Sequence, residues 1–186
     1  GTVWIENLKA GGPHDLTVKA GNQVDVNDVM IGEVWLGSGQ SNMAMAVNRA
    51  KDYEAEKAAA TTPEIRQFLV SSSASAVAKD DCDGKWTVCS PDTVGGFSAT
   101  AYFFGREIHR ELKVPVGLIN SSVGGTPIES WIDAGAQQST PELKGFFEER
   151  ARARAAVDPA AVKAKYEKDL AAWPEKAKAA KAEGKS

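Results

Sequence analysis

The sequence has little of several features that mark particular classes of protein. Its 186 residues include only two cysteines and two histidines, and the formal net charge is −3. Nucleic-acid binding relies on clustered lysine and arginine, so this acidic balance argues against a nucleic-acid partner. No apolar run approaches the roughly 20 residues that span a bilayer, so no membrane association is expected either. A hydrophobic content of 42% is enough for a globular domain with its own core.

The two cysteines, Cys82 and Cys89, lie on either side of Asp83 and Gly84, a pair typical of turns. A hairpin around that turn would bring the two sulfur atoms within disulfide distance. Two unpaired thiols are the alternative, and the spacing does not separate the two. The cysteines therefore leave the redox compartment open.

The order of the apolar runs predicts an α/β domain that follows a short β segment. Residues 1–27 contain β-forming stretches broken by glycine-rich turns, and we interpret them as the end of a neighbouring β-domain. Residues 1–4, which include Val3 and Trp4, have the character of a strand interior and not of a signal peptide, so we expect the natural start of the protein to lie upstream. Residues 28–140 alternate strands and helices, as in a sandwich built on a parallel sheet.

Within residues 28–140 the sequence predicts strands and helices in turn. The expected strands are 29–36, 65–70 and 114–119, and the expected helices are 42–60 and a second one capped by Ser98. In the second helix Phe104, Ile108 and Leu112 recur at intervals of four residues and predict one buried stripe.

Residues 141–186 change in composition to alanine, lysine, glutamate and arginine. They predict two or three charged helices, broken at Asp158 and Pro159 and again at Trp173 and Pro174, that form an insertion or tail outside the core. The amphipathic positions are Val162, Tyr166, Leu170 and Trp173. These positions indicate that the helices pack on another surface.

Ser41 is the main candidate for chemistry because it follows a strand and a glycine-flanked turn. Ligand sites of parallel sheets lie at the carboxyl ends of the strands, and Gly124 and Gly125 fall at another such end. The start of a helix offers free N–H groups and a positive dipole end, which would stabilise the oxyanion of an acyl-transfer intermediate. By local pattern alone, a simple N-cap serine is favoured over a nucleophile. Ser38 competes as nucleophile but lies earlier in the turn.

A series of sequence blocks resembles the sialate O-acetylesterase family of the SGNH hydrolase superfamily, and is also similar to related acetylxylan esterases. The blocks are residues 11–13, 32–36, 38–43, 97–104, 117–122 and 124–131. They occur in the family's order and at plausible spacing. The block that contains Gly39, Gln40, Ser41 and Asn42 corresponds to the family's nucleophile block.

The resemblance implies a three-layer, flavodoxin-like α/β fold of which this chain holds a part. It implies a serine carboxylic-ester hydrolase that removes O-acetyl groups from carbohydrate, above all sialic acid, with Ser41 as nucleophile. Gln40, Gly124 and Gly125 would line the oxyanion and substrate pocket, and Asn120 would either line it or tie the strand end. No metal or organic cofactor is implied. The acetylated carbohydrate substrate implies export to the periplasm or the exterior.

Two other functions stay open, an acetylesterase of xylan or another polysaccharide and a non-catalytic carbohydrate-binding or scaffold relative. The sequence has Val123 where the family has tryptophan, which would leave a pocket wall less aromatic. The family's catalytic histidine and acidic helper lie in downstream blocks that do not occur here. His14 lies in the β segment, and His109 lies off the predicted stripe, where a solvent-facing structural role is expected. We therefore expect the C-terminal remainder of a parent protein as a partner.

The residues after the second glycine turn have structural interpretations that need no catalysis. Thr126, Pro127 and Glu129 match a capping box at the start of a helix. Trp131 would stack on a sugar ring or fill the core, and the core is the more common place for tryptophan.

Overall fold

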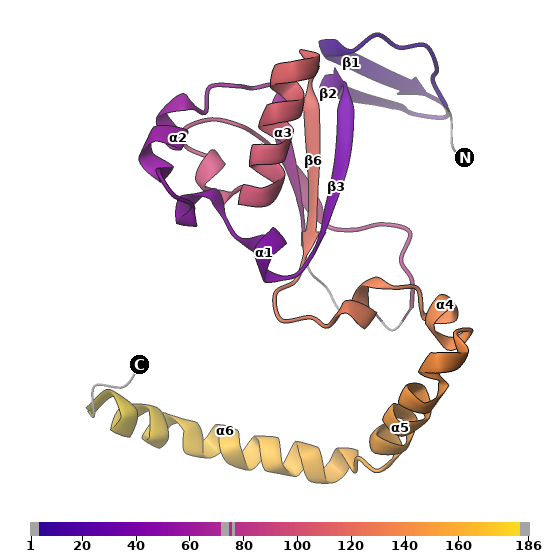
Figure 1. Cartoon of the computed structure of the whole chain (residues 1–186), viewed down its shortest axis with the longest axis vertical. Coiled ribbons are helices and arrows are strands. Elements are labelled where there is room, and N and C mark those ends of the chain that lie inside the picture. The colour runs from indigo at the N-terminus through magenta and orange to yellow at the C-terminus, as the bar shows by residue number, and fades with distance from the viewer. Residues whose placement is uncertain (1–3, 72–74, 76, 183–186) are drawn as a thin grey trace. The chain divides into compact units, whose positions relative to one another are not determined.

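The computed structural model describes residues 4–71, 75 and 77–182 of the chain. The chain divides into two compact units, Gly1–Trp131 and Ile132–Ser186 (Figure 1). The domain boundaries predicted from the sequence fall after Asn27 and Thr140 and stay predictions.

The first unit begins with an antiparallel hairpin of strands β1 (Gly11–Lys19) and β2 (Gln23–Ile31). The hydroxyl of Thr17 donates a hydrogen bond to the carboxylate of Asp25, at 2.7 Å, and Gln23 donates to the same group. These two hydrogen bonds, with that of Thr17 the stronger, lower the pKa of Asp25. Trp4 lies outside any strand, and Val3, expected in the same strand, falls outside the described residues.

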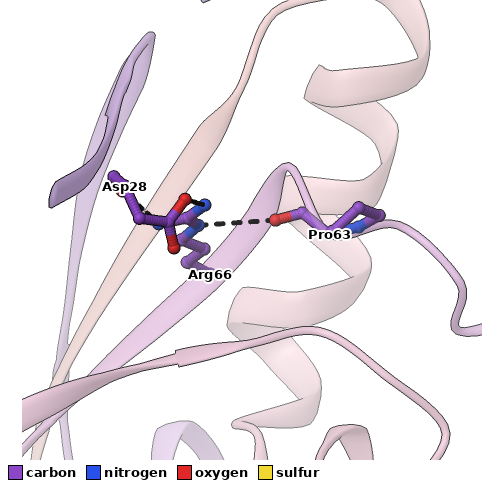
Figure 2. Close-up of polar contacts among 3 residues, drawn as sticks. All are labelled: Asp28, Pro63 and Arg66. Atoms are coloured by element: carbon purple, nitrogen blue, oxygen red, sulfur yellow. Dashed lines mark hydrogen bonds and ion pairs between the residues drawn. The ribbon is translucent and has the colours of Figure 1, made fainter. Parts of the chain in front are cut away.

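Arg66 tethers this hairpin to the main sheet (Figure 2). Its Nη1 and Nη2 atoms donate to the backbone oxygen and to the carboxylate of Asp28, both at 2.7 Å. Its Nε donates a longer bond of 3.4 Å to the carbonyl of Pro63. The two-point contact fixes both the position and the orientation of the end of β2, because the guanidinium group is planar.

The main sheet has the strand order β3-β6-β4-β5. Its strands are β3 (Glu33–Gly39), β6 (Val116–Ser122), β4 (Ile65–Val70) and β5 (Gly84–Val88). The first three are parallel, and β5 pairs antiparallel with β4. This arrangement confirms the predicted α/β class with a parallel sheet.

The prediction of one strand over residues 29–36 was wrong, because the chain breaks at Gly32 between β2 and β3. The backbone at Gly32 lies so close to Pro115 that an added Cβ would be 2.0 Å from the Pro115 oxygen. Only glycine permits this approach, which lets Glu33 N–H donate to Pro115 O and start the parallel pairing.

Helix α3 (Ala99–Leu112) covers one face of the sheet. Its buried residues are Ala99, Ala101, Tyr102 and Gly105, which pack with strand residues such as Leu118. The predicted stripe was therefore wrong in part: Phe104 and Leu112 are 43% and 54% exposed. The small side chains at 101 and 105 let the helix approach the sheet closely, which turns the larger residues toward its flanks.

The predicted helix over residues 42–60 is replaced by three short elements, α1 (Ser41–Ala44), η1 (Val47–Arg49) and α2 (Tyr53–Ala59). Val47 N–H donates to the carbonyl of Phe97, which is distant in sequence, instead of to a carbonyl of the preceding helical turn. Asp52, between η1 and α2, adopts a left-handed backbone with φ of 58°, so the two helices are separate elements. Tertiary pairing thus overrides the helix propensity of this segment.

The opposite face of the sheet carries apolar side chains that stay exposed, among them Val34, Leu36 and Trp86. Trp86 contacts Phe68 edge-on, with ring centroids 5.5 Å apart. Among the described residues of the first unit, the helices cover one face only. This unit therefore holds two of the three layers of the predicted sandwich.

Of the two interpretations that the sequence left open for the cysteines, the structure has the unpaired thiols. Gly84 begins β5, so Cys82 and Cys89 flank the two ends of one strand, about 20 Å apart in extended chain. A disulfide needs Cα atoms within about 7 Å. Cys89 is buried, and this burial raises the pKa of its thiol, while Cys82 is exposed.

The second unit contains helices α4 (Ala134–Gln138), η4 (Pro141–Leu143), α5 (Lys144–Ala155) and α6 (Pro159–Ala182). The predicted break at Asp158 is confirmed, and its carboxylate accepts from the Ala160 N–H. The predicted break at Pro174 was wrong, because Pro174 lies inside α6. Proline removes one hydrogen bond there, and the freed carbonyl on an exposed helix is open to water.

The amphipathic positions of α6, residues 162, 166, 170 and 173, are exposed within this unit. No helix in the described part of the chain combines the length and the apolar character that crossing a membrane requires.

Candidate active site

Ser41 is presented by a turn whose backbone requires glycine. Gly39, the last residue of β3, has a φ of +133°, a conformation that residues with a side chain rarely adopt. Gln40 then turns the chain, and Ser41 opens α1. The hydroxyl of Ser41 is exposed and lies 3.4 Å from Oε1 of Gln40, to which it donates.

Gly124 lies beside Ser41. Strands β3 and β6 are paired so that Gly39 is level with Ser122, and Val123 N–H donates to Gly39 O at 2.9 Å. A Cβ built on Gly124 would be 3.8 Å from both Cα and Cβ of Ser41. The two turns predicted to share one edge of the sheet are therefore in contact, and the chemical roles of their residues stay predictions.

Asn120 lies in β6, two positions before the strand ends at Ser122. Its side chain is buried, and its Oδ1 accepts a hydrogen bond of 2.7 Å from the hydroxyl of Ser122. This hydrogen bond is compatible with a tie at the strand end, and the role of Asn120 stays a prediction.

Ser38 is level with Ser121 inside the β3–β6 pairing, before the turn begins. Because side chains alternate along a strand, Ser38 shares the face of Val34 and Leu36, opposite the helices. This position is consistent with Ser41, rather than Ser38, as the reactive serine.

Comparison with known proteins identifies the family. Residues 31–164 match the carbohydrate esterase family described as sialic acid-specific acetylesterase. The chain belongs to this family. It is 36% identical over 143 residues to the sialate O-acetylesterase of Rattus norvegicus and 33% identical over 145 residues to that of Homo sapiens. Each alignment covers 69% of this chain, but only 26% and 27% of the relative.

A solved structure gives the same result. The crystal structure of a carbohydrate acetylesterase from Xanthomonas citri superposes with a TM-score of 0.67 at 38% sequence identity. The match covers 70% of this chain and 31% of that one. The chain thus has the SGNH-like α/β fold of a carbohydrate esterase, and it spans about a quarter of the length of its curated relatives.

The four-residue length of α1 changes one expectation about this turn. A helix dipole is the sum of aligned peptide dipoles, so one turn supplies little of it. The N–H groups of Met43 and Ala44 both donate to Gln40 O. Stabilisation of an oxyanion at this turn would therefore depend on individual N–H groups, such as that of Ser41, and not on a long-helix dipole.

His109 lies far from Ser41. Its Nδ1 is 2.8 Å from Val114 O, and its Nε2 is 3.5 Å from the carboxylate of Glu64. The side chain is 19% exposed, so the prediction of a solvent-facing residue was wrong, while the structural role agrees with these contacts. Helix α3 starts beside α1 and is about 21 Å long, so its C-terminal residues lie at the other end of the sheet.

His14 is also remote from Ser41. It pairs with Val29 in the hairpin, which joins the sheet at the start of β3, whereas α1 follows the end of β3 (Figure 1). Neither histidine is therefore placed to take a proton from Ser41.

The turn after Gly125 is stabilised by Thr126. Its hydroxyl donates to Val123 O at 2.7 Å and accepts from Nε1 of Trp131 at 2.9 Å. The half-buried indole of Trp131 thus closes the short helix η3 (Ile128–Trp131), in which Glu129 occupies the first turn.

A cavity of about 1050 Å³ adjoins the end of β6. Residues 70, 71, 75, 77–83 and 121–123 line it, and among them Val123 stands where the family has tryptophan. Among the residues that the structure describes, no three His, Cys, Asp or Glu side chains gather as a metal site would require.

Sequence reasoning missed the side chains that hold α1. Ser98 was predicted as the cap of α3, and its hydroxyl does accept from Ala101 N–H at 3.2 Å. The same hydroxyl also donates to Met43 O, and Thr100 and Gln67 contribute related contacts. The block at residues 97–104 was the available signal, because it contains two of these three residues.

Proposed function

We propose that the protein hydrolyses O-acetyl esters on carbohydrate, with sialic acid as the first candidate sugar and Ser41 as the nucleophile. One observation carries this proposal: Ser41 stands on a glycine turn at the carboxyl end of a parallel strand, with the backbone of Gly124 beside it. An exposed hydroxyl next to a backbone without a Cβ leaves room for an acyl group.

In the proposed reaction Ser41 Oγ attacks the acetyl carbonyl while a base accepts its proton. The N–H groups of Ser41 and Gly124 face the developing oxyanion, and Gln40 lines the pocket. The sugar oxygen leaves with a proton, and water then hydrolyses the acetyl-serine to release acetate.

The base would come from outside these 186 residues, because both histidines lie at the far end of the sheet. Among the described strands β3 pairs only with β6, so its outer edge is open next to Ser41. A further parallel strand at this edge would end beside Ser41, since parallel strands share their carboxyl ends. The remaining length of the curated relatives is consistent with such a contribution.

The similarity to a carbohydrate acetylesterase keeps acetylated xylan or another polysaccharide as a second substrate class. A non-catalytic carbohydrate-binding relative is the third possibility, favoured by the distance of both histidines from Ser41. On the basis of the proposed carbohydrate substrate, we propose a periplasmic or secreted location.

The test uses the chain joined to the region that follows the matched segment in its curated relatives, here called the extended enzyme. Acetate release is measured from O-acetylated sialosides and from acetylxylan, with Ser41→Ala and Ser38→Ala variants. We expect Ser41→Ala to lose about 10⁴-fold or more in kcat and Ser38→Ala to lose far less. An active Ser41→Ala variant beside an inactive Ser38→Ala variant would reverse the assignment.

A further inference from the structure

We propose that Thr100 and Ser98, at the start of α3, are positioning residues that hold the Ser41 turn in its reactive geometry. This inference rests on the proposed function of Ser41. Helix α1 has a single turn, and a helix this short is not stable by itself. Its position must therefore be set by contacts from other parts of the fold.

Those contacts come from α3. The hydroxyl of Thr100 donates to the carbonyl of Asn42 at 3.0 Å, and the hydroxyl of Ser98 donates to the carbonyl of Met43 at 2.6 Å. The two acceptors are the first and second residues after Ser41. Both bonds satisfy carbonyl groups at the end of α1 that have no helical partner further along the chain.

Ser98 is itself fixed from the sheet. Ser98 as a whole is 1% exposed, and its N–H donates to Oε1 of Gln67, a β4 residue that is 3% exposed. The Ser98 hydroxyl accepts from Ala101 N–H, which leaves its single proton for Met43 O. A continuous series of hydrogen bonds thus runs from β4 through Ser98 to α1.

Backbone hydrogen bonds extend this contact beyond α1. Ala99 N–H donates to Met45 O at 2.7 Å, and Val47 N–H donates to Phe97 O at 2.9 Å. Ala46 also forms an isolated bridge with Ser98. The chain after Ser41 is consequently aligned along residues 97–100, so α3 and α1 are fixed as one body.

Thr100 contacts the residue after the nucleophile and not the hydroxyl of Ser41. Its loss should therefore shift the direction of Ser41 Oγ without removing a substrate contact. A misplacement of about 1 Å at a reacting group can reduce the rate by on the order of 10²-fold. We expect the effect in kcat, with KM nearly unchanged.

The experiment compares Thr100→Val, which removes the hydroxyl and keeps the shape, with Thr100→Ser, which keeps the hydroxyl. Thr100 is exposed, so neither change should unfold the protein. Thr140→Val is the matched control, because the Thr140 hydroxyl also donates to a helix carbonyl at 3.0 Å but lies in the second unit. In the extended enzyme we expect Thr100→Val to lower kcat by on the order of 10-fold to 100-fold. Thr100→Ser and Thr140→Val should keep it.

Hydrogen exchange in the 186-residue chain provides a readout independent of turnover. The Met43 and Ala44 amides should exchange faster in Thr100→Val than in Thr100→Ser. Equal exchange and equal kcat in Thr100→Val and Thr140→Val would overturn the inference, as would equal impairment in Thr100→Val and Thr100→Ser. A Ser41→Ala variant is measured in parallel. If it stays active the proposed function fails, whereas an inactive Ser41→Ala beside an unimpaired Thr100→Val refutes only the positioning role.

Discussion

Gly39→Ala should destabilise the protein through backbone strain alone. Gly39 has a φ of +133°, which a residue with a side chain rarely adopts. A Cβ at this position would meet only Met43 Cβ, at an ordinary 3.8 Å, so no steric overlap with neighbours adds to the effect. The variant therefore isolates the cost of the backbone conformation that presents Ser41.

The expected cost is about 1–3 kcal/mol for one residue held in a sparsely populated region. For a unit of this size each kcal/mol corresponds to about 3–4 °C in Tm, so the midpoint should fall by roughly 3–12 °C. Thermal unfolding of the 186-residue chain, followed by circular dichroism, measures this shift. Gly96→Ala is the control, because its Cβ would meet nothing within 4 Å and its φ is not in the positive region.

We expect Gly96→Ala to leave Tm unchanged or to raise it slightly, since alanine reduces the freedom of the unfolded chain. If Gly39→Ala were as stable as Gly96→Ala, the turn would have relaxed to ordinary backbone angles. Glycine would then not be required to direct the chain into Ser41.

Four further predictions concern the activity of the chain and residues away from the turn. The 186-residue chain should hydrolyse aryl acetates little above background, and His109→Ala should leave that rate unchanged; a loss would place His109 at the site. Cys82 should react with a thiol reagent at pH 8 and Cys89 only after denaturation. Because burial raises the pKa of Cys89, stability should fall as pH rises above the ordinary value of 9.0, and Cys89→Ala should weaken this dependence in pH-resolved melting curves. Gly105→Ala would place a Cβ 2.8 Å from Leu118, and urea unfolding should show a loss of about 1–3 kcal/mol.

The sequence predicted the features that depend on short local patterns. Strand β4 and the turn before Ser41 follow from apolar runs and from glycines, whose conformational effect is local. The prediction of one long helix after Ser41 was wrong. Alanine and glutamate favour such a helix, but the Val47 N–H donates to the carbonyl of Phe97 instead of to a carbonyl in its own segment. A hydrogen bond between residues 50 positions apart leaves no periodic pattern in the sequence, so helix propensity alone could not reveal it.

The prediction of a buried stripe on α3 was wrong in part for a related reason. Regular spacing of Phe104 and Leu112 predicts a buried face, but the helix rotates so that Gly105 lies against Leu118. The absence of a side chain at Gly105 permits this close approach, and Phe104 and Leu112 stay 43% and 54% exposed. Phe104 instead contacts Trp35 edge-on at 5.0 Å, at the flank of the sheet.

The part of the candidate site that could be predicted is the part that the direction of the parallel strands determines. Parallel strands collect their carboxyl ends at one edge, which is why Ser41 and Gly124 meet although 83 positions separate them. The same polarity explains why a histidine within the chain does not complete the site. Helix α3 runs antiparallel to the strands, so a residue near its C-terminus, such as His109, must lie at the opposite edge. Any base for Ser41 must therefore follow the end of a strand or precede the start of a helix, and neither histidine of this chain occupies such a position.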